Sequence, residues 1–410
     1  MSVRPEPRSL WAGRTLALLG ILLVAGTLRS AVAALSPIVG QISVDVPLSA
    51  TAIGVLGMLP PVCFALFGIF TPVFTRRLGL EKVLVIALVA MAVGHLTRGL
   101  AGTFSVMILG SIVTFAGLGA ANVLLPPLVK KYFPDRVGLM TSLYVTVVSF
   151  SALLPPLIAV PVADAAGWRV SLGLWFLPAL VALAPWLTML VRRRGQVEAD
   201  AALEEADPAL LGQIWRSSIA WALAFVFAAS ALNAYAMFAW LPQLLIDNAG
   251  VTPAQAGTLL SIYAAMGIPC ALLIPWLTAR MKNVAGLVYL GVALFLAGDL
   301  GLLLAPATLT WLWVVLAGLG PLFFPLALVL INLRTRTHAG SVALSGFVQS
   351  IGYIIGALGP LVVGLLHEMS GSWTAPLLFL IATAVAITIA GAVIARPQLL
   401  EDELERRHRG

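Results

Sequence analysis

Long apolar segments recur along the chain and leave it few ways to fold. Twelve stretches of roughly 20 to 30 residues carry almost no charge, and each has the length that an α-helix needs to cross a hydrocarbon core of about 30 Å. Because backbone polar groups find no water inside a membrane, such stretches are expected to be helical. The predicted fold is an all-α membrane protein with twelve transmembrane helices, at residues 15–40, 49–75, 82–101, 103–129, 137–163, 168–191, 216–246, 253–279, 284–305, 308–333, 339–367 and 372–395.

The composition excludes a soluble protein and offers no catalytic or metal site. Hydrophobic residues make up 60% of the chain and charged residues only 10%, against about 25% charged in soluble domains. The two cysteines, Cys63 and Cys270, both lie in apolar segments and provide neither a disulfide framework nor a metal-ligand set. No phosphate-binding loop, His/Glu metal spacing or nucleophile elbow is present. We therefore expect no enzyme activity, no cofactor and no metal.

The basic residues predict the topology. All of the 24 Lys and Arg residues except Arg29, Arg98 and Arg169 fall in the tails or in alternate loops, which would share one side of the membrane. By the positive-inside rule that side is cytoplasmic, so both termini are predicted to be cytoplasmic. This spread over short loops argues against a nucleic-acid partner; the lipid bilayer is the expected surrounding. Arg4, Arg8 and Arg14 precede the first apolar run without a convincing cleavage site, so we expect that run to be a retained span.

The longest loop divides the spans six and six. The expected domains are an N-terminal bundle at 1–191, a charged cytoplasmic linker at 192–215, a C-terminal bundle at 216–396 and a cytoplasmic tail at 397–410. The two halves look related, because LLPPLIAVPVADAAGWR at 153–169 resembles ALGPLVVGLLHEMSGSW at 357–373. An offset near 204 also places Asn233 opposite Arg29. Internal repeats of this kind are typical of transporters whose substrate site lies between the halves.

Three segments are similar to those of one transporter family. They are TLRSAVAALSPIVGQI at 27–42, NAYAMFAWLPQLLIDNAGVTPAQAGTLLS at 233–261, and the stretch 318–373 with its LRTRT and LSGFVQSIGY runs. These resemble the cyanate and 2-nitroimidazole transporter family of the major facilitator superfamily. AAGWRVSLGLW at 165–175 fits the wider superfamily, as does TRRLGLEKVL at 75–84, although that loop lacks the usual acidic residue before its arginines. The resemblance implies two six-helix bundles, alternating access and a monomer.

Arg29 is the leading candidate for the substrate site. It follows Arg14 by fifteen residues, which places it roughly 22 Å into the first span at 1.5 Å per residue. A guanidinium at that depth costs several kcal/mol unless it faces a wet cavity or a partner. Its planar fork of donors suits the oxygens of cyanate, carboxylate or nitro groups. The structural alternative is an arginine bonded to helix carbonyls. We expect Arg29 to be the substrate anchor.

Other polar residues near the middle of spans are candidate substrate contacts. Ser345, Gln349 and Tyr353 are spaced by four and share one helical face. Hydrogen bonding between helices is the alternative role for all of the candidates. His95 and Asp299, with Arg98, lie in the third and ninth spans, which the resemblance places at the periphery; the first two are candidates for proton coupling, with helix packing or an outer polar contact as the alternative. The remaining candidate contacts are Asn122, Tyr144, Ser149, Asn233, Trp240 and Tyr263.

The sequence thus predicts a secondary active or facilitative transporter of a bacterial cytoplasmic membrane. Its cargo would be a small anionic or polar solute such as cyanate, a small carboxylate or a nitro compound. The alternatives are an exporter of neutral nitroheterocycles or other drugs, and a membrane sensor that binds ligand without moving it. An anion carrier should fail without Arg29, whereas an exporter of neutral cargo should lose only part of its affinity.

Overall fold

The computed structural model describes residues 14–192, 213–281, 283–395 and 398–409. Within these residues, twelve helical segments are long and apolar enough to cross a membrane, and their limits lie within a few residues of the predicted spans. The fold is all-helical over the described residues, as predicted. Most of the predicted linker, 193–212, lies outside the described residues.

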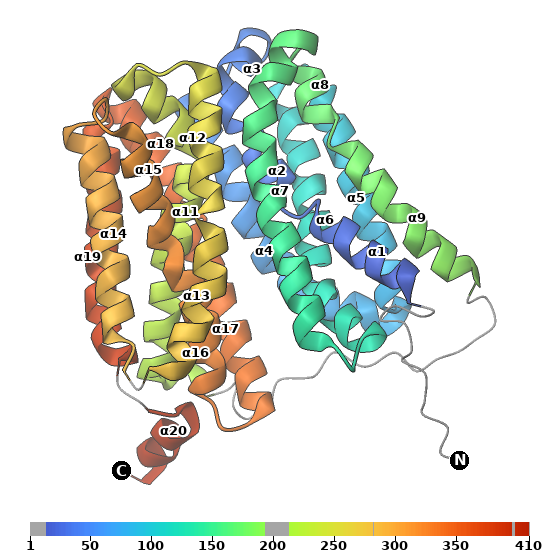
Figure 1. Cartoon of the computed structure of the whole chain (residues 1–410), viewed down its shortest axis with the longest axis vertical. Coiled ribbons are helices and arrows are strands. Elements are labelled where there is room, and N and C mark those ends of the chain that lie inside the picture. The colour runs from blue at the N-terminus through green and yellow to red at the C-terminus, as the bar shows by residue number, and fades with distance from the viewer. Residues whose placement is uncertain (1–13, 193–212, 282, 396–397, 410) are drawn as a thin grey trace, which may run out of the picture.

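The helices form two halves that stand side by side (Figure 1). The first half contains α1 (Thr15–Ala25), α2 (Ser30–Ala33), η1 (Ser36–Ile38), α3 (Val39–Asp45), α4 (Ala50–Leu78), α5 (Leu80–Gly99), α6 (Phe104–Tyr132), α7 (Val137–Ala166), α8 (Trp168–Gly173) and α9 (Phe176–Arg192). The second contains η2 (Ile214–Arg216), α11 (Ser218–Ala249), α12 (Pro253–Ala265), α13 (Gly267–Arg280), α14 (Ala285–Leu304), α15 (Thr310–Leu319), η3 (Gly320–Leu322), α16 (Phe323–Leu333), α17 (His338–Gly356), α18 (Leu358–Ser370) and α19 (Thr374–Ile394). A last helix, α20 (Leu400–Arg409), packs at one end. We call that end the terminal end, and the opposite end, where α3 and α8 lie, the far end (Figure 1).

The first span is broken in its middle. Helix α1 ends at Ala25, and the chain turns through Gly26–Arg29 before α2 begins at Ser30. Arg29 has φ −121° and ψ −6°, outside the usual helical values, and its backbone N–H donates to Ser151 Oγ of α7 over 3.1 Å. This side-chain acceptor satisfies a backbone donor that the break releases from helical bonding. The corresponding span of the second half, α11, runs as one helix of 32 residues.

The two halves repeat one hydrogen bond at the far end, between an indole and a carboxylate, which we call the tie. Trp168 Nε1 donates to Asp45 Oδ2 over 2.9 Å in the first half, and Trp373 Nε1 donates to Asp247 Oδ2 over 2.9 Å in the second. In each case the indole at the start of the sixth span of a half holds the end of the first span of that half. The shared tie extends the repeat seen in the sequence to the hydrogen bonds.

The halves meet closely at the far end. Ser36 Oγ donates to Phe238 O over 2.6 Å, and Thr51 Oγ1 donates to Glu368 Oε2 over 2.6 Å. A Cβ on Gly54 would lie 2.9 Å from Pro360 O, so only glycine allows α4 to approach α18 at this point. The backbones of the two halves are thus in direct contact at this end.

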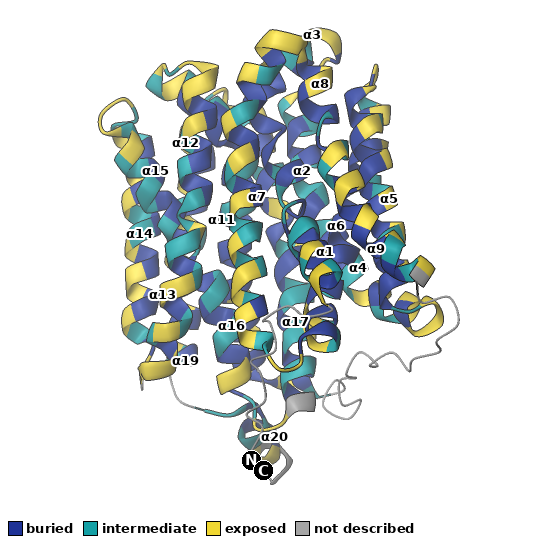
Figure 2. Cartoon of the chain, turned by 45° about the vertical axis from the view of Figure 1, so that its right-hand side comes forward, coloured by how far each residue is buried: buried dark blue, intermediate teal, exposed yellow. Residues whose placement is uncertain are grey.

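Toward the terminal end the two halves make fewer contacts. Helix α7 packs along α12 but makes few contacts with α13, the terminal-end part of the same span. Its first half buries only Met140, whereas its second half buries seven residues between Ser151 and Ala163. Figure 2 shows the exposed positions along α7. The interface between the halves is therefore closed at the far end and looser toward the terminal end.

Candidate functional site

Arg29 places a cation at the centre of the bundle without a carboxylate partner. Its guanidinium carbon lies 5.3 Å from the centre of the Phe64 ring of α4, a cation–π contact. The side chain is half-buried, and its buried Nη1 has no hydrogen-bond partner. No ion pair among the described residues includes Arg29. An unsatisfied donor on a buried cation is a group that a bound anion would stabilise.

The second half faces this cation with aromatic side chains. Tyr235 on α11 and Tyr353 on α17 both lie near Arg29. The Tyr353 ring lies 6.0 Å from Phe64 and 6.4 Å from Tyr235, in edge-to-face contact with both. We call Arg29, Phe64, Tyr235 and Tyr353 the Arg29 cluster. The cluster combines a guanidinium, two hydroxyls and apolar ring faces, which is the mixture expected of a binding site for a small polar ligand.

Two further predicted residues precede Tyr353 in α17. Gln349 Nε2 donates to Ser345 Oγ over 2.6 Å, and both side chains are half-buried. Asn122 on α6 and Tyr144 and Ser149 on α7 are also half-buried; the Ser149 hydroxyl donates to Val145 O of its own helix. The structure therefore joins Tyr353 to Arg29 and places Gln349 and Ser345 on the same helical face.

Three predicted contacts have partners elsewhere. Asn233 Nδ2 donates to Ala229 O and to Thr383 Oγ1 of α19, each over 2.9 Å, within the second half. Trp240 Nε1 donates to Pro360 O over 2.8 Å at the far end. The Tyr263 ring packs edge-on against Phe238 with ring centres 5.6 Å apart, and its hydroxyl is buried without a partner. None of these three contacts involves the Arg29 cluster.

His95 and Asp299 are not outer-surface groups. His95 is 1% exposed and Asp299 is fully buried, and the two carboxylate oxygens of Asp299 have no hydrogen-bond partner. Arg98 and the backbone of Leu172 are neighbours of His95, and Tyr263 is a neighbour of Asp299. The expectation of an outer polar contact is wrong for both, because each side chain points into its own bundle.

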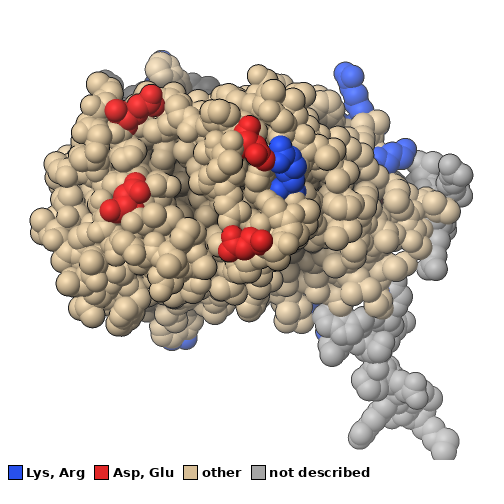
Figure 3. All heavy atoms as spheres, turned by 90° about the horizontal axis from the view of Figure 1, so that it is seen from above, with Lys and Arg blue, Asp and Glu red and all other residues tan. Residues whose placement is uncertain are grey.

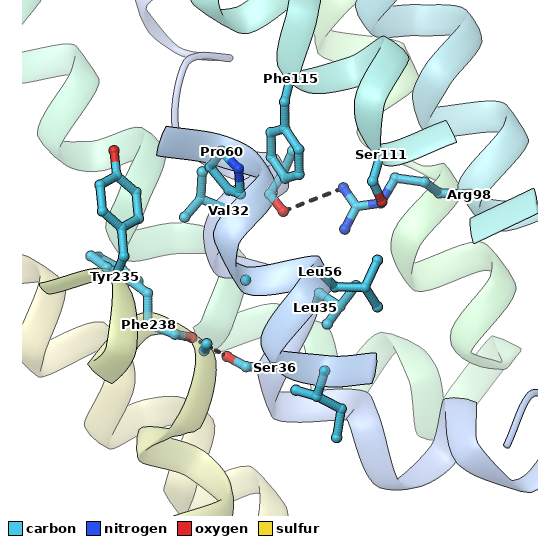
Figure 4. A pocket seen from close by; sticks show the side chains of 14 residues that line it. Val32, Leu35, Ser36, Leu56, Pro60, Arg98, Ser111, Phe115, Tyr235 and Phe238 are labelled. Atoms are coloured by element: carbon cyan, nitrogen blue, oxygen red, sulfur yellow. Dashed lines mark hydrogen bonds between the residues drawn. The ribbon is translucent and has the colours of Figure 1, made fainter. Parts of the chain in front are cut away.

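Sequence reasoning missed Arg98 as a site residue, along with Phe64 and Tyr235. Arg98 is 1% exposed, and its side chain reaches from the last turn of α5 into a pocket of about 30 Å³ between the halves (Figure 4). Tyr235 also lines that pocket. The available signal for Arg98 was the same as for Arg29: a charge inside an apolar span. For the aromatic residues the sequence held no signal, because Phe and Tyr are ordinary in membrane helices.

The model of the Major Facilitator Superfamily matches residues 18–357 of the chain. The chain belongs to this superfamily. It is therefore a transport protein and not an enzyme, as the sequence predicted, and a multi-pass bacterial membrane protein. The structure is similar to a bacterial homologue of the human lysosomal transporter Spinster in an inward-facing and occupied conformation, with TM-score 0.75, 16% identity, and 97% and 99% of the two chains covered. It is also similar to a D-xylose-proton symporter, with TM-score 0.71, 15% identity, and 95% and 97% covered.

Curated relatives match nearly the whole chain. It is 33% identical to the uncharacterized transporter YycB of Bacillus subtilis, over 95% of this chain and 96% of that one. It is 31% identical to the 2-nitroimidazole transporter of Escherichia coli, over 93% and 96% of the two chains. It is 26% identical to the cyanate transport protein CynX of Escherichia coli, over 93% and 98%. The predicted resemblance to the cyanate and 2-nitroimidazole transporters is confirmed.

Proposed function

We propose that the protein carries a small anion or a strongly polar solute across the membrane by alternating access, with Arg29 as the substrate anchor. The observation that carries this proposal is the Arg29 guanidinium, which sits at a helix break, stacks on Phe64 and has a buried donor without a partner. Tyr235 and Tyr353 complete the site from the other half. A bound solute would therefore hold the two halves together at the membrane's centre.

The proposed class of cargo rests on the chemistry of the two solutes for which relatives of the chain are named. One is named for cyanate and the other for 2-nitroimidazole. Cyanate is a small linear anion with acceptors at its oxygen and nitrogen ends, and a nitro group presents two oxygens in one plane. A guanidinium can donate hydrogen bonds to either, with parallel donors for the nitro group. The apolar faces of Phe64 and Tyr353 suit a small flat solute.

The orientation is part of the proposal. The far end carries exposed acidic residues, with Arg169 beside Asp45 as a basic group (Figure 3). The terminal end carries Arg76, Lys130, Arg216 and Arg336 among its basic residues. The positive-inside rule then makes the terminal end cytoplasmic. Because the far end is closed, this arrangement corresponds to a state open toward the cytoplasm.

The test is transport of radiolabelled cyanate by purified protein in liposomes. Arg29→Gln removes the charge and should lower kcat/KM about 100-fold, since removing a buried charge partner costs about 3 kcal/mol. Arg29→Lys keeps the charge without the fork and should fall between that variant and wild type. The matched control is Arg280→Gln, because Arg280 also stacks on an aromatic ring, Trp276 at 4.1 Å, but at the terminal end of its span. Unchanged KM in Arg29→Gln would show that Arg29 is not the anchor.

A second candidate function is export of neutral nitroheterocycles, which the 31% identity to the 2-nitroimidazole transporter favours. A neutral nitro compound depends on Arg29 for hydrogen bonds but not for charge neutralisation. Arg29→Lys should then transport 2-nitroimidazole nearly as well as wild type, and Arg29→Gln should lose about tenfold. A protein that binds either solute but moves neither would instead be a sensor.

A further inference from the structure

A pocket lies between the two halves on the far-end side of Arg29. Its volume is about 30 Å³. Val32, Pro60 and Phe115 are among the apolar residues that line it from the first half, and Tyr235 and Phe238 of α11 line the opposite side (Figure 4). The polar residues of the first half in this lining are Ser36, Arg98 and Ser111, and the Ser36 hydroxyl already donates to Phe238 O. Because a buried water needs only about 10–15 Å³, the space is sufficient for two waters.

Arg98 enters this pocket with most of its hydrogen-bonding capacity unused. The residue is 1% exposed, its Nη1 donates to Ala31 O over a long 3.3 Å, and its guanidinium carbon lies 5.6 Å from the centre of the Phe115 ring. Its Nε has no partner, and no ion pair within the described part of the chain includes it. Arginine carries five N–H donors, and buried donors in native proteins are normally satisfied.

Ser111 adds a second unpaired group to the same pocket. It is 1% exposed, lies one turn of α6 before Phe115, and its Oγ has no hydrogen-bond partner. In an apolar wall, a buried cation with unpaired hydrogen-bond donors lowers the stability of the fold. A buried hydroxyl without a hydrogen bond does the same. A small acceptor-bearing ligand would satisfy both.

The pocket is close to the Arg29 cluster but separate from it. Along α4, its wall residue Pro60 precedes Phe64 by four residues, or roughly 6 Å at the helical rise of 1.5 Å per residue. Arg98 binds the carbonyl of Ala31, two residues after Arg29. Tyr235 is common to both places, since it lies near Arg29 and lines the pocket. A solute leaving the Arg29 cluster toward the far end would meet Arg98 next.

The pocket is covered by the contact between α4, α11 and α18 that closes the far end, which we call the seam. Gly57 of α4 and Ala239 of α11 both line it, and a Cβ on Gly57 would lie 2.8 Å from Ala239 Cβ and from Pro360 Cβ. Opening the far end must separate these backbones, because they belong to different halves. Arg98 and Ser111 would stay with the first half and face the opening.

We propose that Arg98 and Ser111 form a second anion-binding subsite, which holds the transported solute on the far-end side of Arg29 when the far end opens. The inference rests on the proposed function for the class of solute, a small anion or a nitro compound. The guanidinium supplies charge and parallel donors, the hydroxyl supplies a further donor, and the Phe115 ring covers one face. In the closed state the subsite retains room for two waters.

The test compares cyanate uptake from the two sides of the membrane. Right-side-out and inverted vesicles present opposite ends of the protein, and the KM for labelled cyanate is measured in both. Arg98→Gln should raise the KM from the far-end side about tenfold, leaving the terminal-end KM and the maximal rate within about twofold. Ser111→Ala should raise the far-end KM about threefold. Arg98→Lys should recover part of the wild-type affinity.

The control is Arg334→Gln. Arg334 is likewise buried, has an Nε without a partner and donates its Nη2 to a carbonyl of another helix, Ile394 O at 3.0 Å, but at the terminal end. A purely structural role for Arg98 predicts lower thermal stability and equal changes in both KM values. If Arg98→Gln fails to fold, Ser111→Ala and Arg98→Lys decide the question, because neither removes the charge.

Failure of this inference is distinguishable from failure of the proposed function. If Arg29→Gln loses transport from both sides while the Arg98 and Ser111 variants keep the wild-type far-end KM, the subsite is refuted and the anchor stands. If Arg29→Gln transports normally and Arg98→Gln does not, the anchor is refuted and the cation at Arg98 is the binding group.

Discussion

The two halves of the molecule share their ties at the far end and differ at the centre. The indole–carboxylate bond between Trp168 and Asp45 recurs between Trp373 and Asp247 with the same distance of 2.9 Å. At the centre, by contrast, the first half breaks its first helix and exposes part of Arg29, whereas the second half keeps α11 continuous and buries Asn233 completely.

This difference separates the contacts that both halves share, which serve packing, from the groups that only one half carries, which we propose serve binding. Both cations next to the seam, Arg29 and Arg98, come from the first half, and the tyrosines that face Arg29 come from the second. The proposed site is therefore complete only where the halves meet. With this division of groups, solute binding would be coupled to the approach of the two halves.

The largest effect is expected when an arginine like Arg29 of the first half is placed at the corresponding position of the second half, Asn233. Asn233→Arg would put a guanidinium at a fully buried position of a continuous helix, where Thr383 is the hydrogen-bond partner of Asn233 from another helix within the described residues. An unpaired charge at such depth costs about 3 kcal/mol or more, so the protein should express poorly or unfold on purification. Size-exclusion chromatography and thermal unfolding measure this. Asn233→Ala is the control, with a loss of about 1 kcal/mol and transport within about threefold of wild type. A stable, active Asn233→Arg protein would contradict the contrast between the halves.

A smaller effect is expected from the tyrosine that the second half contributes. Tyr353→Phe keeps the ring contacts with Phe64 and removes the hydroxyl near Arg29. The KM for cyanate should rise about threefold to tenfold, the value of one hydrogen bond. Tyr263→Phe is the matched control, since its hydroxyl is buried without a partner and lies near Asp299 instead of Arg29. Equal KM increases in both variants would remove Tyr353 from the site.

The repeated ties predict unequal losses of stability. Asp45 accepts hydrogen bonds from both Trp168 and Arg169, whereas Asp247 accepts from Trp373 and from Gln243. Asp45→Asn also loses an ion pair, so it should lower the unfolding temperature more than Asp247→Asn. Differential scanning fluorimetry in detergent compares the two variants. A larger drop in Asp247→Asn would contradict the stabilising role assigned to the Arg169–Asp45 ion pair.

The smallest effect concerns pH at the terminal end, where helix α20 is held against the start of α11 by Glu403, a contact we call the clamp. Burial by itself raises the pKa of Glu403 on α20, but hydrogen bonds from Ser217, Ser218 and Ile219 at the start of α11 outweigh it and lower the pKa below the ordinary value. A lowered folded-state pKa contributes stability above the unfolded pKa, near 4.3, which is lost as the pH falls through the folded-state value. The protection factors of the α20 amides, which compare observed with intrinsic hydrogen-exchange rates, should therefore fall as the pH drops below the unfolded pKa. In Glu403→Gln the protection factors should be low at every pH in this range; protection that persists in this variant would exclude the clamp.

Most of the fold was predictable because a membrane imposes it. The lengths of the apolar stretches predicted all twelve spans, and the charged residues in the loops between them marked their ends. The break at Gly26–Arg29 was not predictable, since its backbone donor is satisfied by Ser151, which lies 122 residues later in the chain. Local propensity carries no information about such a partner.

The site was only partly predictable. Arg29 stood out as a charge at mid-depth, and Tyr353 followed from the spacing along one helical face. Asn233 was expected to mirror Arg29, but the repeat preserves the position in sequence without preserving the environment: an unbroken α11 directs that amide to Thr383. Arg98 was placed at the periphery because α5 is an outer helix, and its long side chain reaches inward to Ala31 nonetheless.

The central claim is that Arg29 binds the cargo, and ligand-dependent thermal stability of the purified protein tests it most directly. Cyanate, small carboxylates, nitrate, 2-nitroimidazole and neutral azoles would be compared on wild type and Arg29→Ala. A ligand at about 100 times its Kd stabilises the native state by about 2.7 kcal/mol. We expect anions to raise the unfolding temperature of wild type and to leave that of Arg29→Ala unchanged. If Arg29→Ala keeps the full shift, Arg29 has a structural role and the account of the site is wrong.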